Sequence, residues 1–178
     1  MKIPHDPDEI VALVDENDEI VGESRRLDVH LKGFMHREVA VAIVNSKGQM
    51  LMHKRADNGQ WDPSAAGHFP KDFSYEEAAV KEVEEELGIM IEQSELKEIC
   101  YQVFRNRIDD AKDNNRFVKA FMVVRDMDIE EFNIDPGEVA EVRWMGKEEI
   151  DSIANSDEKA MTTAARVIIQ EKLGDVLK

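Results

Sequence analysis

Three glutamates lie close together in the stretch GHFPKDFSYEEAAVKEVEEELGI, which runs from Gly67 to Ile89. On a helix with about 100° per residue, Glu82, Glu85 and Glu86 fall within an arc of roughly 100°. Like charges three or four residues apart destabilise a helix by roughly 0.2–0.5 kcal/mol per pair. A divalent cation between the carboxylates would turn this repulsion into attraction, so the arrangement predicts a metal site.

The ligands in this cluster are all carboxylate oxygens on one helix. Such ligands suit Mg²⁺, with Mn²⁺ as the alternative, because both cations prefer oxygen and can bind substrate phosphates at the same time. The competing interpretation is a solvated acidic face, since the chain contains 39 Asp and Glu residues. Helical geometry also places Glu84 about 200° from Glu82, so Glu84 is expected to face water.

A loop and a capped helix must position these glutamates. Ser74, followed three residues later by Glu77, forms a capping box, so a helix is predicted from Tyr75 to Leu87. Gly88 is expected to end this helix. Gly67 precedes the helix in a loop where the backbone can approach a ligand closely.

Apolar patterns predict strands and helices around this loop and helix. We expect an N-terminal β-hairpin over residues 1–25, a short link over 26–30, and the strands HREVAVAIV and QMLMHKR. The loop DNGQWDPS and the short strand SAAGHF follow. The strands ELKEICYQVFRNR and RFVKAFMVVRDM flank the polar loop IDDAKDNN, and EVAEVRWM is the last strand. Helices are expected at KEEIDSIA and over residues 157–176. This order predicts a single α/β domain over residues 1–178, an α/β/α sandwich with a mixed sheet.

Composition limits the classes of partner. The 178 residues carry a net charge of −16, which disfavours nucleic-acid polymers and anionic membranes. No run of 18 apolar residues and no signal peptide is evident, and the single cysteine fits a reducing compartment, so a cytoplasmic location is expected. A small phosphorylated ligand stays compatible with this charge if cations offset it locally. The sequence is compatible with a homodimer.

The stretch from Gly67 to Ile89 resembles the Nudix box, in which a glycine precedes a helix with a spaced set of glutamates. It keeps the following motif positions: Gly67, Glu82, Val83, Glu85, Glu86, Gly88 and Ile89. Two positions depart, because Phe73 stands where the family has its first glutamate and Lys81 stands where it has arginine. The resemblance covers most of the chain and implies a Nudix-like sandwich that hydrolyses diphosphates with Mg²⁺. The two departures put the rate in doubt more than the metal site.

The segments before the motif resemble the Nudix subgroup related to isopentenyl-diphosphate isomerase. There, histidines around the third strand bind a metal; His36 and His68 match two such positions, and His30 is one residue out of step with a third. Arg26 and Arg55 match cations that hold the substrate diphosphate. The alternative is that both matching histidines are strand-end residues bonded to backbone, and that Arg55 is a solvated charge.

Isomerase activity itself is disfavoured by two positions. The isomerase needs a cysteine directly before the Gly-His pair, where this chain has Ala66, and an acid–base glutamate near the position of Arg116. Neither alanine nor arginine can carry out that proton transfer.

The resemblance therefore implies a hydrolase of a nucleoside diphosphate linked to another group, or of a related diphosphate. Gly67, Glu82, Glu85 and Glu86 would hold Mg²⁺, and Glu82 or Glu85 would accept the proton of the attacking water. Arg26 and Arg55, with His36 and His68, would line the substrate side. A metal- and phosphate-binding module with little activity is the second hypothesis, and the isomerase is the third. The substrate itself is not specified.

Overall fold

β3 (Met35–Val44) is the central strand of a mixed sheet in the computed structural model, which describes residues 6–178. It pairs in parallel with β8 (Lys112–Val124) and antiparallel with β6 (Ala65–His68). At its two ends it pairs with β1 (Ile10–Val14) and β4 (Met50–Arg55). Parallel and antiparallel pairs in one sheet confirm the predicted α/β class.

Four further strands extend the sheet on both sides. β2 (Ile20–Arg25) pairs with β1, and β7 (Lys97–Asp109) pairs with β8. β5 (Trp61–Asp62) and β9 (Val139–Met145) both pair with β4. β5 lies inside the segment DNGQWDPS, which the sequence analysis assigned to a loop, because its two residues pair with His53 and Lys54.

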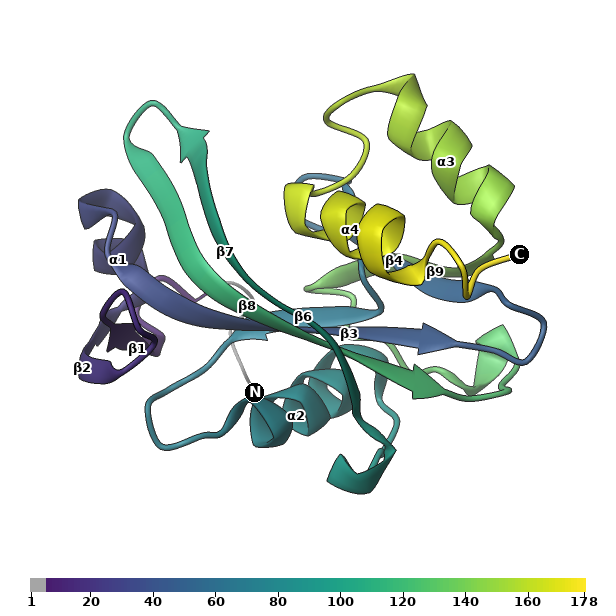
Figure 1. Ribbon diagram of the computed structural model, residues 1–178, viewed down its shortest axis with the longest axis horizontal. Helices are drawn as coiled ribbons and strands as arrows, with labels where there is room; N and C mark the ends of the chain where they lie inside the picture. The colour runs from purple at the N-terminus through teal and green to yellow at the C-terminus, as the bar shows by residue number, and fades with distance from the viewer. Residues whose placement is uncertain (1–5) are drawn as a thin grey trace.

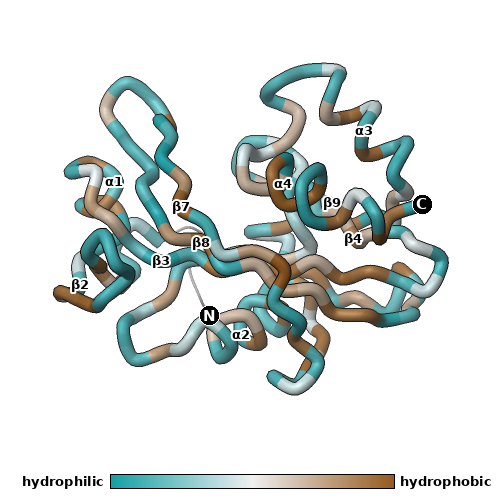
Figure 2. Tube along the Cα trace, viewed as in Figure 1, coloured by the Kyte–Doolittle hydropathy of each residue, from teal (hydrophilic) through white to brown (hydrophobic). Residues whose placement is uncertain are grey.

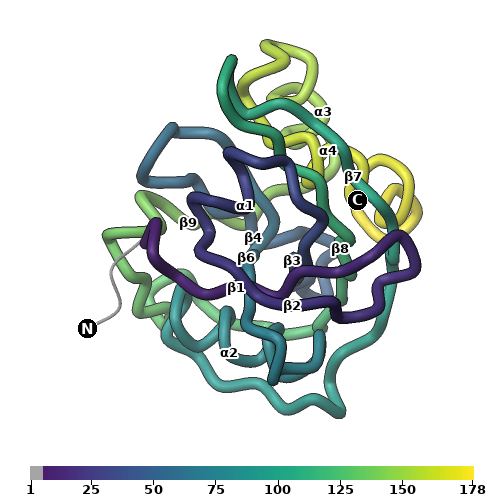
Figure 3. Tube along the Cα trace, turned by 90° about the vertical axis from the view of Figure 1, so that its left-hand side faces the viewer, coloured from purple at the N-terminus to yellow at the C-terminus, as the bar shows by residue number. Residues whose placement is uncertain are grey.

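Helices cover both faces of the sheet, as Figures 1 and 3 show. α2 (Tyr75–Leu87) lies on one face, while α3 (Lys147–Ser156) and α4 (Thr163–Val167) lie on the other. Successive residues of β3 point to opposite faces. Val39, Val41 and Ile43 pack with α2, whereas the side chains at 40, 42 and 44, two alanines and a valine, pack with α3 and α4. The result is two apolar cores in an α/β/α sandwich.

The predicted bounds of the glutamate-bearing helix are confirmed. Ser74 Oγ accepts the Glu77 backbone N–H at 3.1 Å, and the Glu77 carboxylate accepts the Ser74 N–H at 2.8 Å. Gly88 adopts a φ of 66°, a left-handed conformation that ends the helix. Val83 and Leu87 are fully buried, so the helix docks through its apolar stripe and its rotation about its own axis is fixed.

The N-terminal hairpin is confirmed over β1 and β2, while residues 1–5 of its predicted range lie outside the described residues. The link after it is helical, α1 (Arg26–Lys32). Asp18, in the hairpin turn, accepts hydrogen bonds from Arg37 Nε at 2.7 Å, Tyr75 Oη at 3.0 Å and Tyr101 Oη at 2.7 Å. These bonds hold the hairpin against the start of α2 and against β7.

Two predicted boundaries are wrong. The polar segment IDDAKDNN is mostly strand, because the pairing of β7 with β8 continues to Asp109 and Lys112 despite hydrophilic side chains (Figure 2). The C-terminal helix begins at Thr163 instead of 157. Thr162 Oγ1 accepts the Ala165 N–H at 3.3 Å and caps it. A π-helical stretch over Ile168–Leu173 continues the helix.

Short 3₁₀ turns at Gln93–Glu95 and Ile129–Glu131 complete the regular structure. Among the described residues, every helix is too short or too polar to cross a membrane.

Candidate active site

A buried carboxylate cluster lies where α2 meets the sheet. Glu82 and Glu86 expose only 1% and 3% of their surface, and Glu138, from the turn before β9, exposes 8%. One carboxylate oxygen from each lies within 4.8 Å of the others. Three carboxylates this close repel one another strongly in a buried setting, so the arrangement suits a bound cation.

Gly67 makes room for this cluster. A Cβ built on Gly67 would lie 2.4 Å from the Glu82 carboxylate carbon, far inside van der Waals contact. The backbone of β6 can therefore come close to Glu82 only because residue 67 has no side chain. The sequence predicted that the backbone at Gly67 can approach a neighbouring group closely. In the structure that neighbouring group is the Glu82 carboxylate.

Electrostatics at Glu86 fit a hard divalent cation. Burial raises the pKa of Glu86 well above 4.5, and the charges of Glu82, Glu138 and Asp62 raise it further. Its Oε2 has no hydrogen-bond partner, although His53 Nδ1 lies 3.5 Å away. A buried carboxylate oxygen without a donor is costly, and a cation at this point would satisfy it. The residues present therefore fit Mg²⁺ or Mn²⁺.

Glu84 and Glu85, which neighbour Glu86 in the sequence, lie apart from this cluster. Glu84 is exposed, as the helical projection predicted. Glu85 is partly exposed, and its carboxylate accepts a hydrogen bond from Lys81 Nζ at 2.7 Å. Lys81, which replaces the arginine of the motif, also lies 3.8 Å from Glu82. Thus Glu82 and Glu86 are brought together, whereas Glu85 lies beside them at the edge.

Glu138 was missed by the sequence analysis. It directly follows a Pro-Gly turn and belongs to no helical pattern, so nothing local separated it from the other acidic residues. The antiparallel pairing of β9 with β4 delivers it to the cluster, since Val139 pairs with Arg55. The one sequence feature that could have pointed to Glu138 is its position between the Pro-Gly turn and the start of the last strand.

Three histidines form a second cluster in the same region. His30 in α1, His36 in β3 and His68 in β6 are all buried, and one nitrogen of each lies within 4.8 Å of the others. His68 Nε2 lies 3.0 Å from His36 Nε2. The structure therefore joins His30 to the pair predicted from sequence, because the last turn of α1 places the His30 ring edge-on against the rings of His36 and His68.

Backbone carbonyls set which nitrogen of two of the three rings is free to bind. His36 Nδ1 lies 3.0 Å from the Phe34 carbonyl, and His30 Nδ1 lies 3.2 Å from the Asp113 carbonyl. A carbonyl can only accept, so each Nδ1 carries the proton and each Nε2 presents its lone pair. Burial lowers the pKa of His36 to about 3 and the pKa of His68 well below 6.5. Three neutral imidazoles of this kind could hold a transition metal.

Arg116 stands beside the histidines and is buried with a carboxylate. Its Nε lies 2.7 Å from Glu38 Oε2, and that oxygen lies 3.9 Å from His68 Nε2. Its Nη1 donates to Asn106 Oδ1 at 2.7 Å. The position where an isomerase would need a glutamate therefore holds a guanidinium in a fixed ion pair, and Ala66 precedes Gly67 and His68.

Arg55 and Arg26 lie at the edges of the same cavity. Arg55 donates from Nε and Nη2 to Asp57 at 3.0 and 2.8 Å, and from Nη1 to Asp62 at 3.2 Å. Arg26 Nη1 donates to Glu9 at 3.4 Å. The pairing of β1 with β3 brings Arg26 beside the domain, so both predicted cations line one cavity.

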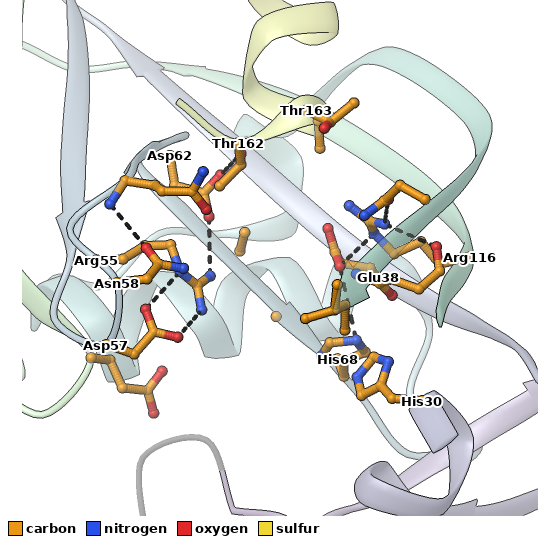
Figure 4. A pocket seen from close by; sticks show the side chains of 18 of the residues that line it. His30, Glu38, Arg55, Asp57, Asn58, Asp62, His68, Arg116, Thr162 and Thr163 are labelled. Carbon is orange, nitrogen blue, oxygen red and sulfur yellow. Dashed lines mark hydrogen bonds and ion pairs between the residues drawn. The ribbon is translucent and has the colours of Figure 1, made fainter. Parts of the chain in front are cut away.

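The three carboxylates, His30, His68 and both arginines line a single cavity of about 1160 Å³. His36, which the sequence placed on the substrate side, is fully buried behind His68 and does not line it. Figure 4 shows Arg55, Asp57 and Asp62 on one wall, and His30, His68, Glu38 and Arg116 on the other. Glu82, Glu86 and Gly67 also line it. The cavity can accommodate a polyanion, some of whose oxygens would bind a metal at the carboxylates while others accept hydrogen bonds from the arginines.

Gly67 lies in strand β6 and not in the loop that the sequence suggested, because it pairs with Val39. A sandwich that brings such a glycine against a glutamate-bearing helix at this cavity defines a Nudix-type domain. The NUDIX domain family matches residues 35–168, so the chain belongs to the Nudix family.

Relatives and solved structures agree with this assignment. The chain is 32% identical over 152 residues to the uncharacterized Nudix hydrolase lmo0368 of Listeria monocytogenes, covering 82% of this chain and 85% of the relative. It is 27% identical over 168 residues to isopentenyl-diphosphate Delta-isomerase 2 of Photorhabdus laumondii, covering 91% of each. The crystal structure of DR0079 from Deinococcus radiodurans has a TM-score of 0.68 and 22% identity, covering 92% of this chain and 99% of that one. The predicted fold and the resemblance to both branches are confirmed.

Proposed function

We propose that the protein is a metal-dependent hydrolase that cleaves a phosphoanhydride bond in a nucleoside diphosphate linked to another group, or in a related diphosphate. The observation that carries this proposal is the buried cluster of Glu82, Glu86 and Glu138 against Gly67, inside a cavity lined by arginines. Membership of the Nudix family supports the same reaction class.

The cation would be Mg²⁺, with Mn²⁺ as the alternative, held by Glu82, Glu86 and Glu138 and by the Gly67 backbone. When bound, it supplies neutralisation of the diphosphate charge and polarisation of the attacked phosphorus. Glu85 stays a candidate ligand from the motif, although its ion pair with Lys81 would have to open.

The protein's own groups would orient the diphosphate and move the proton. Arg55 and Arg26 donate N–H groups to phosphate oxygens, and each must share its donors with a neighbouring carboxylate. Glu82 or Glu85 accepts the proton of the attacking water; of the two, Glu82 lines the cavity. The buried walls exclude bulk water from these groups.

The isomerase stays a second candidate because of one observation, the gathered histidines. His30, His36 and His68 present ring nitrogens to a common point, as the resemblance to the isomerase implied for two of them. Ala66 and the Arg116–Glu38 ion pair remove the groups that isomerisation needs, so hydrolysis is the better supported reaction.

A screen over a panel of diphosphates with Mg²⁺ or Mn²⁺, in which a phosphatase added afterwards releases inorganic phosphate from the monoester products, tests the proposal. Turnover that Glu82→Gln abolishes and Glu84→Gln leaves intact would support a hydrolase. Metal and diphosphate binding without turnover would support the binding-module hypothesis. Interconversion of isoprenoid diphosphates without phosphate release would overturn hydrolysis in favour of the isomerase.

A further inference from the structure

Arg55 is held by two aspartates that differ in burial. Its Nε and Nη2 donate to the two carboxylate oxygens of Asp57 at 3.0 and 2.8 Å, and its Nη1 donates to Asp62 Oδ2 at 3.2 Å. The Asp57 side chain is 38% exposed, whereas the Asp62 side chain is 7% exposed. Figure 4 shows the guanidinium between both aspartates on one wall of the cavity. The edge of the guanidinium that Asp57 covers is therefore the edge that a ligand from solvent reaches first.

Asp62 is anchored in the fold. It lies in β5, where strand pairing places it opposite His53 of β4. Its Oδ1 accepts a hydrogen bond from Thr162 Oγ1, and the Thr162 N–H donates to the Trp61 carbonyl at 3.0 Å. Turning the carboxylate away from Arg55 would break a buried hydrogen bond, which is costly. Asp62 therefore keeps its hold on the guanidinium when a ligand arrives.

Asp57 is anchored only locally. It lies two residues after Arg55, in the turn that joins β4 to β5. The Gly59 N–H donates to the Arg55 carbonyl at 3.1 Å, and Gly59 closes the turn with a φ of 72°. Exposed ion pairs contribute little to stability, because water competes for both partners. The Asp57 carboxylate can therefore turn into solvent at small cost.

The ion pair on the opposite wall does not share this property. The side chains of Arg116 and Glu38 are only 6% and 12% exposed. Separating a buried pair leaves an uncompensated charge in the protein, which is strongly unfavourable. An incoming anion would therefore displace Asp57 far more readily than Glu38.

The geometry of the Asp57 pair matches that of a bound phosphate. A guanidinium donates two parallel hydrogen bonds from adjacent nitrogens to a carboxylate or to a phosphate. Asp57 accepts such a pair from Nε and Nη2 of Arg55. Its carboxylate oxygens thus lie where two phosphate oxygens would lie on the same edge.

We infer that Asp57 occupies the phosphate-binding edge of Arg55 in the ligand-free protein and leaves it when a diphosphate binds. Asp62 is a positioning residue that keeps the guanidinium in place during this exchange. The inference rests on the contact between Arg55 and phosphate in the proposed function. A competing carboxylate lowers the apparent affinity by the fraction of molecules in which the edge is open. Every anion that uses this edge should therefore be weakened by the same factor.

Asp57→Ala tests the exchange in isothermal titrations with methylenediphosphonate, a diphosphate analogue with a bridge that water cannot cleave, in the presence of Ca²⁺. The dissociation constant is expected to fall by about two- to fivefold, the range for loss of one exposed ion pair. Glu158→Gln is the matched control, because Glu158 is an exposed carboxylate that lines the same cavity. Weaker or unchanged binding in Asp57→Ala, or an equal gain in Glu158→Gln, would overturn the inference.

Asp62→Ala should act in the opposite direction, although it also removes a negative charge. Binding is expected to weaken by about tenfold, because the guanidinium loses its fixed orientation. If circular dichroism shows that this variant is unfolded, Thr162→Val tests the same anchor, since it removes the hydroxyl that is bonded to Asp62. Its binding should weaken by about two- to threefold. Unchanged or tighter binding in a folded variant would contradict the positioning role.

The double variant Arg55→Ala with Asp57→Ala shows whether the effect passes through the arginine. Without Arg55, loss of Asp57 should change the affinity no more than Glu158→Gln does, and a larger gain would overturn the exchange. These titrations need no turnover, so the two proposals can fail separately. If no diphosphate is hydrolysed, the hydrolase proposal fails, while a gain in Asp57→Ala that depends on Arg55 keeps the inference. Hydrolysis without that gain, or no binding of the analogue to the unmodified protein, overturns the inference alone.

Discussion

The carboxylate cluster and the histidine cluster lie in one cavity but have opposite electrostatics. Adjacent residues of β6 serve both, since Gly67 lies against Glu82 and His68 joins the other two histidines. Burial raises the pKa of Glu86 and lowers the pKa of His36 and His68. In both clusters burial disfavours the charged form. The same desolvation therefore disfavours the charged form of Glu86 in the metal-free protein and keeps the histidines neutral.

The difference between the clusters concerns the kind of cation and the pH at which each is ready to bind. Oxygen ligands suit Mg²⁺ or Mn²⁺, whereas imidazoles suit transition metals. Because burial raises the pKa of Glu86, metal binding there competes with a proton, while the neutral histidines need no deprotonation. One cavity thus offers two chemically distinct sites, and only the first belongs to the motif that the sequence displays.

The largest expected effect is on catalysis and distinguishes the clusters directly. Glu86→Gln should lower kcat/KM with Mg²⁺ by roughly a hundredfold or more, because the metal supplies several kcal/mol of transition-state stabilisation. His36→Asn should leave Mg²⁺-dependent turnover within a few-fold. Steady-state formation of the monophosphate products, followed by coupled phosphatase release, measures both. If the two variants lose activity equally, the assignment of Mg²⁺ to the carboxylates alone is wrong.

The next effect concerns the arginine on the wall opposite the histidines. A charge-assisted hydrogen bond to phosphate is worth roughly 1.5–3 kcal/mol, so Arg55→Ala should weaken diphosphate binding by about ten- to a hundredfold. Arg26→Ala should act in the same direction but less, because Arg26 lies at the other edge with Glu9. Calorimetry in Ca²⁺ gives the affinities. If Arg55→Ala binds the diphosphate as tightly as the unmodified protein, Arg55 does not contact phosphate, and its role is limited to the ion pairs with Asp57 and Asp62.

The third effect is on stability against pH in the metal-free protein. The folded-state pKa of His36 is about 3, below its ordinary 6.5, so its contribution is present above pH 6.5 and is lost as pH falls toward 3. His36→Asn should remove up to about 1.4 kcal/mol per pH unit from the acid slope of the unfolding free energy. Urea unfolding between pH 7 and 4.5 measures it.

Glu86 should act in the opposite direction over the same range. Its folded-state pKa is raised above 4.5, so the stability it contributes is present below pH 4.5 and is lost as pH rises through the raised value. Glu86→Gln should therefore stabilise the metal-free protein at neutral pH. If the unfolding free energies of His36→Asn and Glu86→Gln changed with pH in the same way, the two clusters would not have opposite electrostatics.

The smallest expected effect tests the two motif departures beside the carboxylates. Phe73 packs partly buried against the α2 core, and Lys81 pairs with Glu85. If the missing glutamate and arginine of the motif slow an active enzyme, the double substitution Phe73→Glu with Lys81→Arg should raise turnover a few-fold. The reason is that arginine can hold two carboxylates in a fixed fork. Activity that stays at zero while Mg²⁺ still binds would favour the binding module.

Much of the fold followed from local sequence patterns. The capping box at Ser74 and the glycine at 88 set both ends of α2, and its apolar stripe set which glutamates turn inward. Alternation in β3 determined its two buried faces. The polar hairpin tip and the start of α4 were misassigned, because strand pairing and a threonine cap outweighed composition there.

The sequence by itself determined the Nudix motif, the arc that Glu82, Glu85 and Glu86 share, and the outward direction of Glu84, because helical period depends only on spacing. The structure decided that Glu82 and Glu86 are buried in the cluster while Glu85 stays at its edge. Tertiary structure alone decided that Glu138 completes the carboxylate cluster, that His30 joins His36 and His68, and that Arg116 is paired with Glu38. Each of these contacts joins segments far apart in the chain. Their proximity is set by strand register and helix docking, which no local pattern encodes.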